Sequence, residues 1–484
     1  MNEIDKTIIE ELASRVEELG GRAYMVGGAV RDEIMKRPIK DVDIEVHGIS
    51  GAILETVLKE LGKPLRFGSA FGVYSLAGHQ IDIALPRSER KAGNGHRDFE
   101  IEIDPFIGIK EAARRRDFTM NALLKDILSG EIADPYGGTE DIENRIIRHI
   151  DDEKFGEDPL RALRAAQFRS RLGFQVAPST ISICRALDLR NLSSERVEME
   201  MKKALLESRR PSEFFECLRE MGQLGYWFQE LEQLIGLEQN PKFHPEGDVW
   251  THTMMVLDRA AQFRPSASDP YAFMLLALTH DFGKITTTEF VNGAIHAYGH
   301  EIQGAEIAER FLDRICHGSD IKKYIANMIP NHMRPNKIAE ARSSVKKTNR
   351  MFDDAIAPSD LIYFAICDKP KLPHLDAHNL SQASNEPHEI QGNIEIESEL
   401  YTADERLRER ERIQFLFDRL DLYRDMMARP YVTGKDLIDR GIMPGDDFGT
   451  ILEYAHKLRL AGVSKDDALK QTLSYARKLR KNIK

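Results

Sequence analysis

Two glycines and then two aspartates stand close together near the start of the chain, in Val26-Gly27-Gly28-Ala29-Val30-Arg31-Asp32 and in Asp41-Val42-Asp43. Short apolar runs predict two strands here, over residues 23–26 and 41–46, with a helix between them. A glycine pair at a strand-to-helix turn lets backbone amides approach an anion, so we expect Gly28 to contact a phosphate. Arg31, one turn into the helix, could reach the same phosphate.

The two aspartates predict a metal site. Residues i and i+2 of a strand face the same side, so Asp41 and Asp43 would repel each other unless a cation lies between them. Oxygen ligands of this kind suit Mg²⁺, which takes substrate phosphates as further ligands. A predicted hairpin, residues 73–77 and 80–85, carries Asp82, which is either a third carboxylate of this site or a solvent-facing polar residue.

The composition is that of a folded chain. Its 484 residues carry a formal net charge of −11, with 42% hydrophobic residues, which excludes intrinsic disorder and predicts about three or four domains. Four cysteines without a C-x-x-C pair argue against a zinc ribbon or a redox couple and predict buried thiols. The longest apolar run, residues 271–278, is too short to span a bilayer, and the first residues lack a secretory signal. We therefore predict a cytoplasmic protein without membrane segments.

The predicted secondary structure changes along the chain. Apolar residues at helical spacing predict an amphipathic helix over residues 4–19, and residues 1–145 indicate a mixed α/β domain. Strand signals nearly vanish from about residue 150 to residue 385, where helical periodicity dominates. The predicted fold class is therefore α+β, a mixed α/β head followed by helical domains.

Three segments near the end of the chain have distinct compositions. Polar residues 381–399 predict a connection, and the charge run over residues 404–412 predicts a solvated helix face. A compact final unit is expected from about Tyr431. Lys and Arg outnumber Asp nine to two from Lys457 to Lys484, so this tail could lie along phosphates.

Several ordered blocks of the first 165 residues resemble the head of class II tRNA nucleotidyltransferases, the CCA-adding enzymes, and of their bacterial poly(A) polymerase relatives in the DNA polymerase β superfamily. The first block is the glycine and aspartate segment described above. The others are Arg115-Arg116-Asp117-Phe118-Thr119-Met120-Asn121-Ala122-Leu123, Asp134-Pro135-Tyr136-Gly137-Gly138 and Gly156-Glu157-Asp158-Pro159-Leu160-Arg161-Ala162-Leu163-Arg164. Coincidence is implausible for blocks in this order.

The resemblance implies roles for the later blocks. Arg116 and Asp117 would contact the ribose and phosphates of the nucleotide, and a carboxylate that accepts from a 2′-hydroxyl favours ribonucleotides. Asp158 and Arg161 would form a protein template for the base. On a helix predicted over residues 158–172 they lie at i and i+3 on one face, and Arg164 repeats that step. A carboxylate and a guanidinium can select cytosine and adenine, which offer an amine beside an acceptor nitrogen. An intrahelical ion pair is the alternative explanation of this spacing.

Two features bear on nucleotide preference. Gln167 stands where many relatives have an arginine, which removes a cation expected near the triphosphate and predicts a weaker nucleotide grip or a changed preference. Residues 84–95 resemble the flexible loop that the family associates with switching from C to A addition, which favours full CCA addition.

Histidines and aspartates form a second set, which resembles an HD domain: His252, His280, Asp281, His300, His332 and Asp368. His296 is the alternative to His300. In the HD-bearing bacterial branch of the CCA enzymes, phosphohydrolase activities on 2′,3′-cyclic and 2′-phosphate esters are known. Imidazole and carboxylate ligands from several helices suit a divalent transition metal that activates water.

The resemblance implies four domains: a nucleotidyltransferase head (residues 1–145), a helical neck with the template motif (146–240), an HD domain (241–385) and a helical tRNA-binding tail (386–484). Glycine turns between Tyr431 and Leu452 resemble that tail, and the alternative is a small helical packing unit.

The function predicted from these features is template-independent addition of C, C and A to the 3′ end of tRNA from CTP and ATP, by two-metal nucleotidyl transfer. One alternative is a poly(A) polymerase or a partial, CC- or A-adding, enzyme, which would share the head motifs. Another is a non-enzymatic tRNA-binding or metal-sensing module, against which the intact Asp41 and Asp43 argue.

Overall fold

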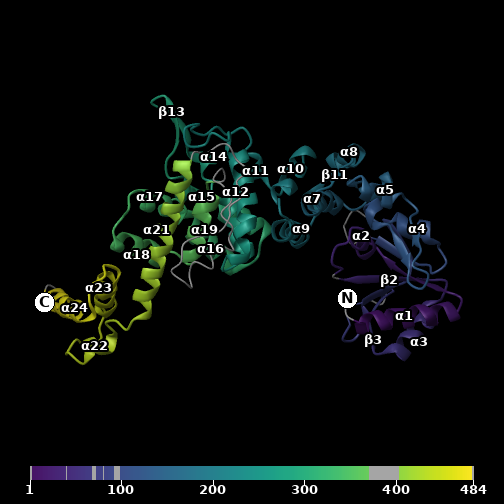
Figure 1. Cartoon of the computed structure of the whole chain (residues 1–484), viewed down its shortest axis with the longest axis horizontal. Helices are drawn as coiled ribbons and strands as arrows, with labels where there is room; N and C mark the ends of the chain where they lie inside the picture. The colour runs from purple at the N-terminus through teal and green to yellow at the C-terminus, as the bar shows by residue number, and fades with distance from the viewer. Residues whose placement is uncertain are drawn as a thin grey trace. The chain divides into compact units, whose positions relative to one another are not determined.

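The computed structural model of the chain describes residues 3–39, 41–67, 72–79, 81–91, 99–369 and 403–481 (Figure 1). The chain divides into two compact units, Met1–Trp227 and Phe228–Lys484. The predicted connection over residues 381–399 and the domain boundary at residue 385 lie outside the described residues, as does part of the loop over residues 84–95.

A mixed sheet forms the first part of unit 1, in the strand order β3-β4-β5-β2-β1-β8-β9. The strands are β1 Arg22–Val26, β2 Val42–His47, β3 Pro64–Phe67, β4 Val73–Leu76, β5 Ile81–Ala84, β8 Leu124–Asp126 and β9 Ile132–Ala133. Strands β2 and β5 run parallel, and the other neighbouring pairs run antiparallel. The predicted first two strands and the predicted hairpin are confirmed. Strands β6 Arg87–Lys91 and β7 Phe99–Ile103 form a separate hairpin.

Helices α1 Glu3–Glu18 and α3 Gly51–Leu61 cover one face of this sheet (Figure 1). Leu12 and Val16 of α1 share a buried core with Leu58 of α3 and with Ile44 and Ile83 of the sheet. Because side chains alternate along a strand, the burial of Ile44 turns its neighbour Asp43 to the opposite face. The amphipathic first helix is confirmed, and its core position determines which side of the sheet carries the aspartates.

The remaining elements of unit 1 are mainly helices: α2 Gly28–Ile34, α4 Ile109–Arg114, α5 Gly138–Glu143, α6 Asp152–Gly156, α7 Leu160–Leu172, α8 Pro178–Ala186, α9 Ser194–Glu207 and α10 Ser212–Glu220. Two short strands, β10 Ile146–Ile147 and β11 Gln175–Val176, pair in parallel. Helix α7 packs against α9 and α10. It begins at the predicted template motif, so the neck helices hold that motif in place.

Unit 2 is mainly helical: α11 Gln229–Glu232, α12 Val249–Phe263, α13 Pro270–Thr279, α14 Lys284–Thr287, α15 His300–Ile315, α16 Ser319–Asn331, α17 Arg334–Glu340, α18 Val345–Asp354, α19 Pro358–Cys367, α21 Ala403–Ala428, α22 Gly434–Ile438, α23 Phe448–Leu460 and α24 Lys465–Lys481. The longest apolar run forms α13, in which every residue from Tyr271 to Thr279 is buried. In the described ranges, no helix has the length and apolar character needed to cross a membrane. All four cysteines are buried and free, as predicted.

Helices dominate after residue 150, as predicted, and one short hairpin in unit 2 is an addition that was not predicted. Strands β12 Thr288–Val291 and β13 Ala294–Ala297 pair across a two-residue turn. The turn residues Asn292 and Gly293 have φ values of 51° and 80°, which match the tight turn that an Asn-Gly pair favours between antiparallel strands. The local turn chemistry therefore outweighed the helical pattern around it.

The charge run over residues 404–412 is helical, as predicted, but it is not uniformly solvated. Glu409 and Arg412 are 8% and 6% exposed and pair with each other, and Arg412 also contacts Asn336. Further along, Leu437, Ile451 and Ala476 share a small buried core. The final segment is thus a helical packing unit, and its predicted role in tRNA binding stays a prediction.

Candidate functional site

Three exposed carboxylates lie close together where strands β2 and β5 pair. Asp43 of β2 lies directly opposite Asp82 of β5 in the parallel register, and Asp41 stands just before β2. Loss of water raises the pKa of Asp43, Arg116 acts against this, and the negative charges of Asp82 and Asp41 raise it further. Oxygen donors that repel one another in this way fit a hard divalent cation. The register therefore favours Asp82 as the third carboxylate.

The next acidic residue of β2 has a different role. Glu45 is 2% exposed, and its carboxylate faces Arg115 Nη2 at 3.3 Å, Arg116 Nη2 at 3.6 Å and His47 Nε2 at 2.9 Å. Burial acts to raise the pKa of Glu45, but these three neighbours lower it to about 2. Glu45 is thus a permanent anion that holds Arg116 beside the aspartates. Sequence analysis missed it, although its i+2 spacing from Asp43 was a signal.

Gly27, more than Gly28, is the glycine that the turn requires. Its φ is +71°, and a Cβ there would lie 2.8 Å from Nη1 of Arg116. At Gly28 the nearest atom to such a Cβ, Arg31 Nη2, is at an ordinary contact distance of 3.5 Å. The absence of a side chain at Gly27 thus lets the Arg116 guanidinium lie against the turn. The predicted phosphate contact of Gly28 stays a prediction.

Arg31 and Arg164 lie at the two ends of a hydrogen-bonded chain. Arg31 Nη1 donates to Asn121 Oδ1 at 2.7 Å, Asn121 Nδ2 donates to Asp117 Oδ1 at 2.9 Å, and Arg164 Nε donates to Asp117 Oδ2 at 2.7 Å. The ring of Phe168 lies beneath both guanidinium groups, 5.1 Å and 5.4 Å from their central carbons. The structure therefore brings together three predicted nucleotide residues and adds Asn121, which sequence analysis did not single out.

The acceptor positions of the Asp117 carboxylate are occupied by hydrogen bonds from its protein neighbours. Besides Asn121 and Arg164 it accepts a hydrogen bond from the backbone amide of Phe118 at 2.8 Å. Burial acts to raise the pKa of Asp117, but Arg164 and the hydrogen bond from Asn121 lower it. Arg164 Nη2 also lies 2.6 Å from Asp117 Oδ2. A carboxylate offers about four acceptor positions and all four are occupied, so a 2′-hydroxyl must displace one of these donors. The predicted 2′-hydroxyl contact stays a prediction, and it requires Arg164 or Asn121 to move.

The prediction that Asp158 and Arg161 lie on one face of the same helix is wrong. Helix α7 begins at Leu160 after Pro159, because the residue before a proline is disfavoured in helical conformation. Asp158 Oδ2 pairs instead with Arg196 Nη2 of α9 at 2.9 Å, so an intrahelical ion pair does not explain the spacing. Arg161 donates to the backbone carbonyls of Lys154 at 2.8 Å and Arg115 at 2.5 Å. Both side chains are thus fixed by partners that the sequence pattern did not indicate.

Gln167 is buried in α7, 1% exposed. In the orientation that satisfies its amide, its oxygen accepts from Arg171 Nη1 at 2.9 Å. Its predicted effect on the grip on the nucleotide stays a prediction.

In unit 2 the predicted histidines and aspartates come together at the ends of helices. His252 lies on α12, His300 starts α15, and the others follow directly after the last turns of α13, α16 and α19: His280, Asp281, His332 and Asp368. Nε2 of His252 is 3.3 Å from Asp368 Oδ1, and Nε2 of His280 is 3.2 Å from Asp281 Oδ2. His300 Nε2 lies 3.5 Å from Asp281 Oδ1. These spacings are those expected between ligands of one metal ion.

Hydrogen bonds orient the four imidazoles in the same way. Nδ1 of His280, His300 and His332 donates to the backbone carbonyl three residues earlier, at 3.0, 2.8 and 2.6 Å. Nδ1 of His252 donates to Glu246 Oε1 at 2.8 Å. An N–H at Nδ1 makes Nε2 the nitrogen that faces the cluster, and in His252 this Nε2 lies 3.3 Å from Asp368 Oδ1, within hydrogen-bond distance. Nε2 of His280 is buried without a hydrogen-bond partner. The cluster fits a bound divalent cation.

The charges within the cluster depend strongly on one another. Burial lowers the pKa of His332 to about 4. Burial acts to raise the pKa of Asp368, but the hydrogen bond from His252 and nearby imidazoles lower it to about 2. Two groups of metal-ligating side chains share Asp281, one with His252 and His280 and one with His300 and His332. His296 instead stacks on Tyr298, so the geometry selects His300.

Sequence analysis missed two residues that support this cluster. Glu246 accepts from both His244 Nδ1, at 3.0 Å, and His252. Lys284 is 7% exposed; its ammonium lies 2.7 Å from Asp281 Oδ2 and donates to Gln239 Oε1 at 2.7 Å. Both residues are close in sequence to a predicted ligand, and that proximity was the only signal.

Gly283 allows α14 and α15 to meet at the cluster. A Cβ on Gly283 would lie 1.9 Å from the backbone oxygen of His300, so Gly283→Ala must push the two segments apart. We expect the substitution to destabilise unit 2 by about 1–3 kcal/mol or more and to lower its metal content. Thermal unfolding and metal analysis check this, with Gly449→Ala as control because a Cβ added there would meet no atom within 4 Å. Equal melting and metal content in both variants would contradict the expectation.

Comparisons with known proteins find matches for segments in both units of the chain. Family models described as "Poly A polymerase head domain", "Probable RNA and SrmB- binding site of polymerase A" and "HD domain" match residues 23–148, 173–235 and 249–422. The multifunctional CCA protein of Actinobacillus pleuropneumoniae serotype 5b is 37% identical over 326 residues, which cover 66% of this chain and 77% of that protein. The chain belongs to the CCA-adding enzyme family. It falls in the branch of that family that carries an HD domain.

Other members of the CCA-adding enzyme family extend the comparison. The multifunctional CCA protein of Pasteurella multocida is 37% identical over 341 residues, 68% of this chain and 79% of that protein. A Thermotoga maritima CCA-adding enzyme complexed with tRNA has a TM-score of 0.61 at 18% identity, covering 97% of this chain and 95% of that one. A Bacillus stearothermophilus enzyme in complex with CTP has a TM-score of 0.60 at 20% identity, covering all of both chains. At these identities the structural likeness shows the fold.

Proposed function

We propose that this chain adds C, C and A to the 3′ end of tRNA, with CTP and ATP as substrates. The observation that carries the proposal is the arrangement of Asp43 opposite Asp82, beside the arginine that Glu45 holds in place. The name of the relatives at 37% identity, multifunctional CCA protein, supports CCA addition, and the complex of a structural neighbour with tRNA supports tRNA as the acceptor. The protein is therefore a tRNA nucleotidyltransferase.

The acidic residues of the head are proposed to bind metal, and the basic residues are proposed to bind the nucleotide. Asp41 and Asp43 would hold Mg²⁺, with Asp82 as the third carboxylate; the metal supplies Lewis acidity for the attacking 3′-hydroxyl and the leaving pyrophosphate. Arg116 lies beside these carboxylates and is fixed by Glu45, so it is placed to bind the phosphates of the nucleotide. Arg31 and Arg164 have rigid partners, so little side-chain freedom is lost when they bind a nucleotide.

Incorporation assays test this function. The protein is incubated with tRNA that lacks its 3′ end and with CTP alone, ATP alone or both. Full CCA addition requires CTP first, and ATP incorporation should follow only where two cytidines are present. Extension with ATP alone into a long tail would instead identify a poly(A) polymerase, and a stop after CC would identify a partial enzyme.

Substitution of Asp158 or Arg161, the predicted protein template for the base, should change nucleotide choice more than nucleotide binding. Loss of a bidentate contact with a base costs about 1–3 kcal/mol of discrimination, so we expect Asp158→Ala and Arg161→Ala to reduce the preference for CTP over UTP roughly ten- to a hundredfold. Arg196→Ala should act in the same direction, because Arg196 orients Asp158. Competition assays with paired nucleotides measure the preference.

Arg190→Ala serves as the control for these variants, because that exposed arginine pairs only locally, with Asp188. If all three variants reject UTP and GTP as strongly as the parent, the selection of the base belongs to other residues.

We infer that the HD cluster is a second, hydrolytic site for cyclic or 2′-phosphate esters. The proposed ligands are the six residues of the cluster: His252, His280, Asp281, His300, His332 and Asp368. The uniform orientation of the imidazoles and the unpaired Nε2 of His280 support a resident divalent transition metal. Such a metal activates water for attack on phosphorus. Lys284 adds a buried cation next to Asp281, which suits an anionic substrate.

The same proposal includes the division into head (1–145), neck (146–240), HD domain (241–385) and tail (386–484). The tail is proposed to contact tRNA, and the site of action to be the cytoplasm. Limited proteolysis tests the boundaries.

A further inference from the structure

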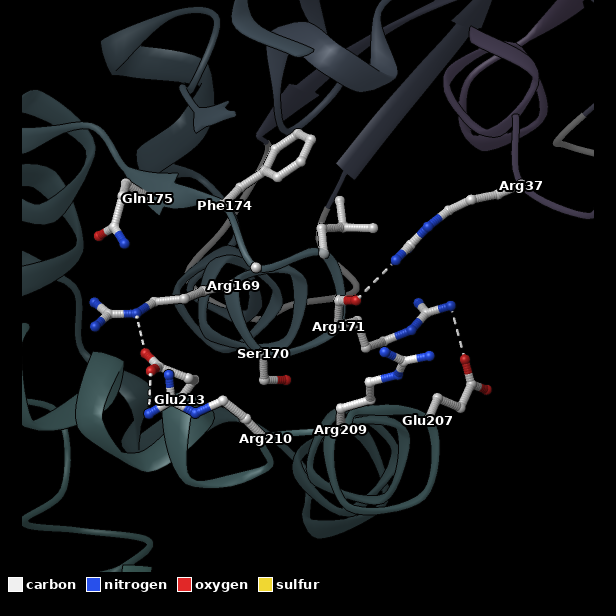
Figure 2. A pocket seen from close by; sticks show the side chains of 12 residues that line it. Arg37, Arg169, Ser170, Arg171, Phe174, Gln175, Glu207, Arg209, Arg210 and Glu213 are labelled. Atoms are coloured by element: carbon white, nitrogen blue, oxygen red, sulfur yellow. Dashed lines mark hydrogen bonds and ion pairs between the residues drawn. The ribbon is translucent and has the colours of Figure 1, made fainter. Parts of the chain in front are cut away.

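A basic pocket lies in unit 1 where α7 and α9 end (Figure 2). Its volume is about 440 Å³, and it is lined by the last turn of α7, the start of β11, the loop between α9 and α10, and Arg37 after α2. None of the predicted nucleotide residues lines it. The pocket is large enough for a phosphate group with the sugar next to it, and the nucleotide site does not account for it.

Five arginines and two glutamates line this pocket: Arg37, Arg169, Arg171, Arg209, Arg210, Glu207 and Glu213. Figure 2 shows Arg169 and Arg210 beside Glu213, with Nε and Nη2 at 2.9 and 3.1 Å from its oxygens. Arg171 Nη2 pairs with Glu207 Oε2 at 2.7 Å. Both carboxylates are therefore used by three of the arginines. Arg169 also pairs with Glu220, just outside the lining, at 2.6 Å, so the pocket together with this neighbour keeps a net charge of plus two.

Two arginines of the pocket have no carboxylate partner among the described residues. Arg37 donates only to the backbone carbonyl of Arg171, at 3.3 Å, and Arg209 is exposed in the loop after α9. In Figure 2 their guanidinium groups lie on the same side of the pocket as that of Arg171. Three cations lie on one side, and only Arg171 among them pairs with a carboxylate, Glu207. This is the arrangement of a site for an anion.

Stabilisation of helix ends does not account for the whole cluster. Arginines in a last turn offset the partial negative charge of a helix C-terminus, about half an elementary charge, and Arg169 and Arg171 fit that role in α7. The ends of α7 and α9 together would neutralise about one positive charge. About one remains of the net charge of plus two, and the two arginines without a carboxylate partner, Arg37 and Arg209, stand outside both helices.

We propose that this pocket binds a backbone phosphate of the tRNA substrate. Planar guanidinium groups match the geometry of a phosphate, and one phosphodiester would balance the remaining charge. Arg171 lies ten residues after Arg161 in α7, about 15 Å along the helix axis. A few nucleotides of the acceptor strand can span that distance, so the pocket can take a phosphate upstream of the 3′ end. The family match for RNA binding begins at residue 173, at the pocket's edge.

The inference rests on the proposed tRNA nucleotidyltransferase function. A free phosphate, such as the pyrophosphate product, offers the same chemistry as a backbone phosphate. The test must therefore separate these two sources.

The variant Arg37→Ala/Arg209→Ala removes the two unpaired cations and leaves the ion pairs of the pocket intact. We expect it to weaken binding of tRNA about tenfold at moderate salt. The slope of log affinity against log salt should fall by about one for each lost phosphate contact. The KM for CTP at saturating tRNA should stay within about twofold of the parent.

The control Lys6→Ala/Arg190→Ala removes the same charge from exposed positions of unit 1 that do not line the pocket. Arg209→Glu alone, a single charge reversal in a loop, keeps the test informative if the double variant melts early. Inhibition by pyrophosphate is measured for every variant.

Binding and salt slope equal to those of the control would overturn the proposal. An altered inhibition by pyrophosphate with unchanged tRNA binding would also overturn it, because the pocket would then take a free anion. If the parent itself neither bound tRNA nor incorporated nucleotides, the proposed function would be wrong and the inference would fall with it. Weaker tRNA binding with a lower slope, in a parent that incorporates CTP, supports it.

Discussion

Asp43→Ala should reduce the incorporation of both CTP and ATP by more than about a hundredfold, the effect of deleting one group that stabilises charge in a transition state. Asp41→Ala should do the same. Both carboxylates are exposed, and Asp43 lies opposite Asp82. We therefore expect the loss of activity to result from the missing cation ligand, because the core of the head is unchanged. Binding of tRNA should change little, because no contact with the acceptor is removed. Single-turnover incorporation and filter binding measure the two quantities.

Asp188→Asn is the matched control, since it neutralises an exposed carboxylate elsewhere in unit 1. Asp82→Asn separates the two interpretations of that residue, because a third ligand would lower incorporation and a solvent-facing residue would not. Retention of a tenth of the activity in both Asp41→Ala and Asp43→Ala would exclude the metal assignment.

His280→Ala/Asp281→Ala should remove the bound metal of unit 2 and, with it, the hydrolysis of 2′,3′-cyclic and 2′-phosphate esters, while CCA addition stays within about twofold. The two sites use different ligands, carboxylates alone in the head and imidazoles with carboxylates here. Metal analysis and ester hydrolysis are measured beside nucleotide incorporation.

Folding must be compared first, because both residues are buried, 0% and 2% exposed, and an emptied metal site can unfold its domain. Asp281→Asn, which preserves volume, provides a second variant. Unchanged metal content and hydrolysis in well-folded variants would show that these residues are structural.

The head could be predicted in large part because its signals are local. Apolar runs, the glycine pair and the i+2 aspartates determine β1, α2 and β2, and the structure confirms them. The position of Asp82 next to Asp43 depends on strand register, which sequence spacing alone does not determine. Partners such as Glu45 with Arg115, or Asp158 with Arg196, come from different elements. Long-range pairing of this kind has no periodic signal.

Two features that were not predicted, the late start of α7 and the hairpin of unit 2, did have a local signal in the sequence. Pro159 follows Asp158 directly, and the restriction that a proline places on the preceding residue indicates that the helix starts later. Asn292-Gly293, flanked by residues that suit strands, is typical of a two-residue hairpin. In both places a specific dipeptide determines the backbone conformation more strongly than the helical periodicity around it. In the HD cluster, by contrast, the residue types carried the prediction, and the fold brought together six residues from five separate places in the sequence.

The chain of hydrogen bonds from Arg31 through Asn121 and Asp117 to Arg164 has a consequence for sequence divergence. Donors and acceptors alternate along it, and Asn121 and Asp117 are buried. A single replacement would leave a neighbour with an unmet donor or acceptor, at a cost of about 1–3 kcal/mol, whereas a paired replacement could restore the match. These four positions should therefore covary among homologues, with losses occurring in pairs, and the order in which substitutions are accepted at one of them should depend on what already occupies the others.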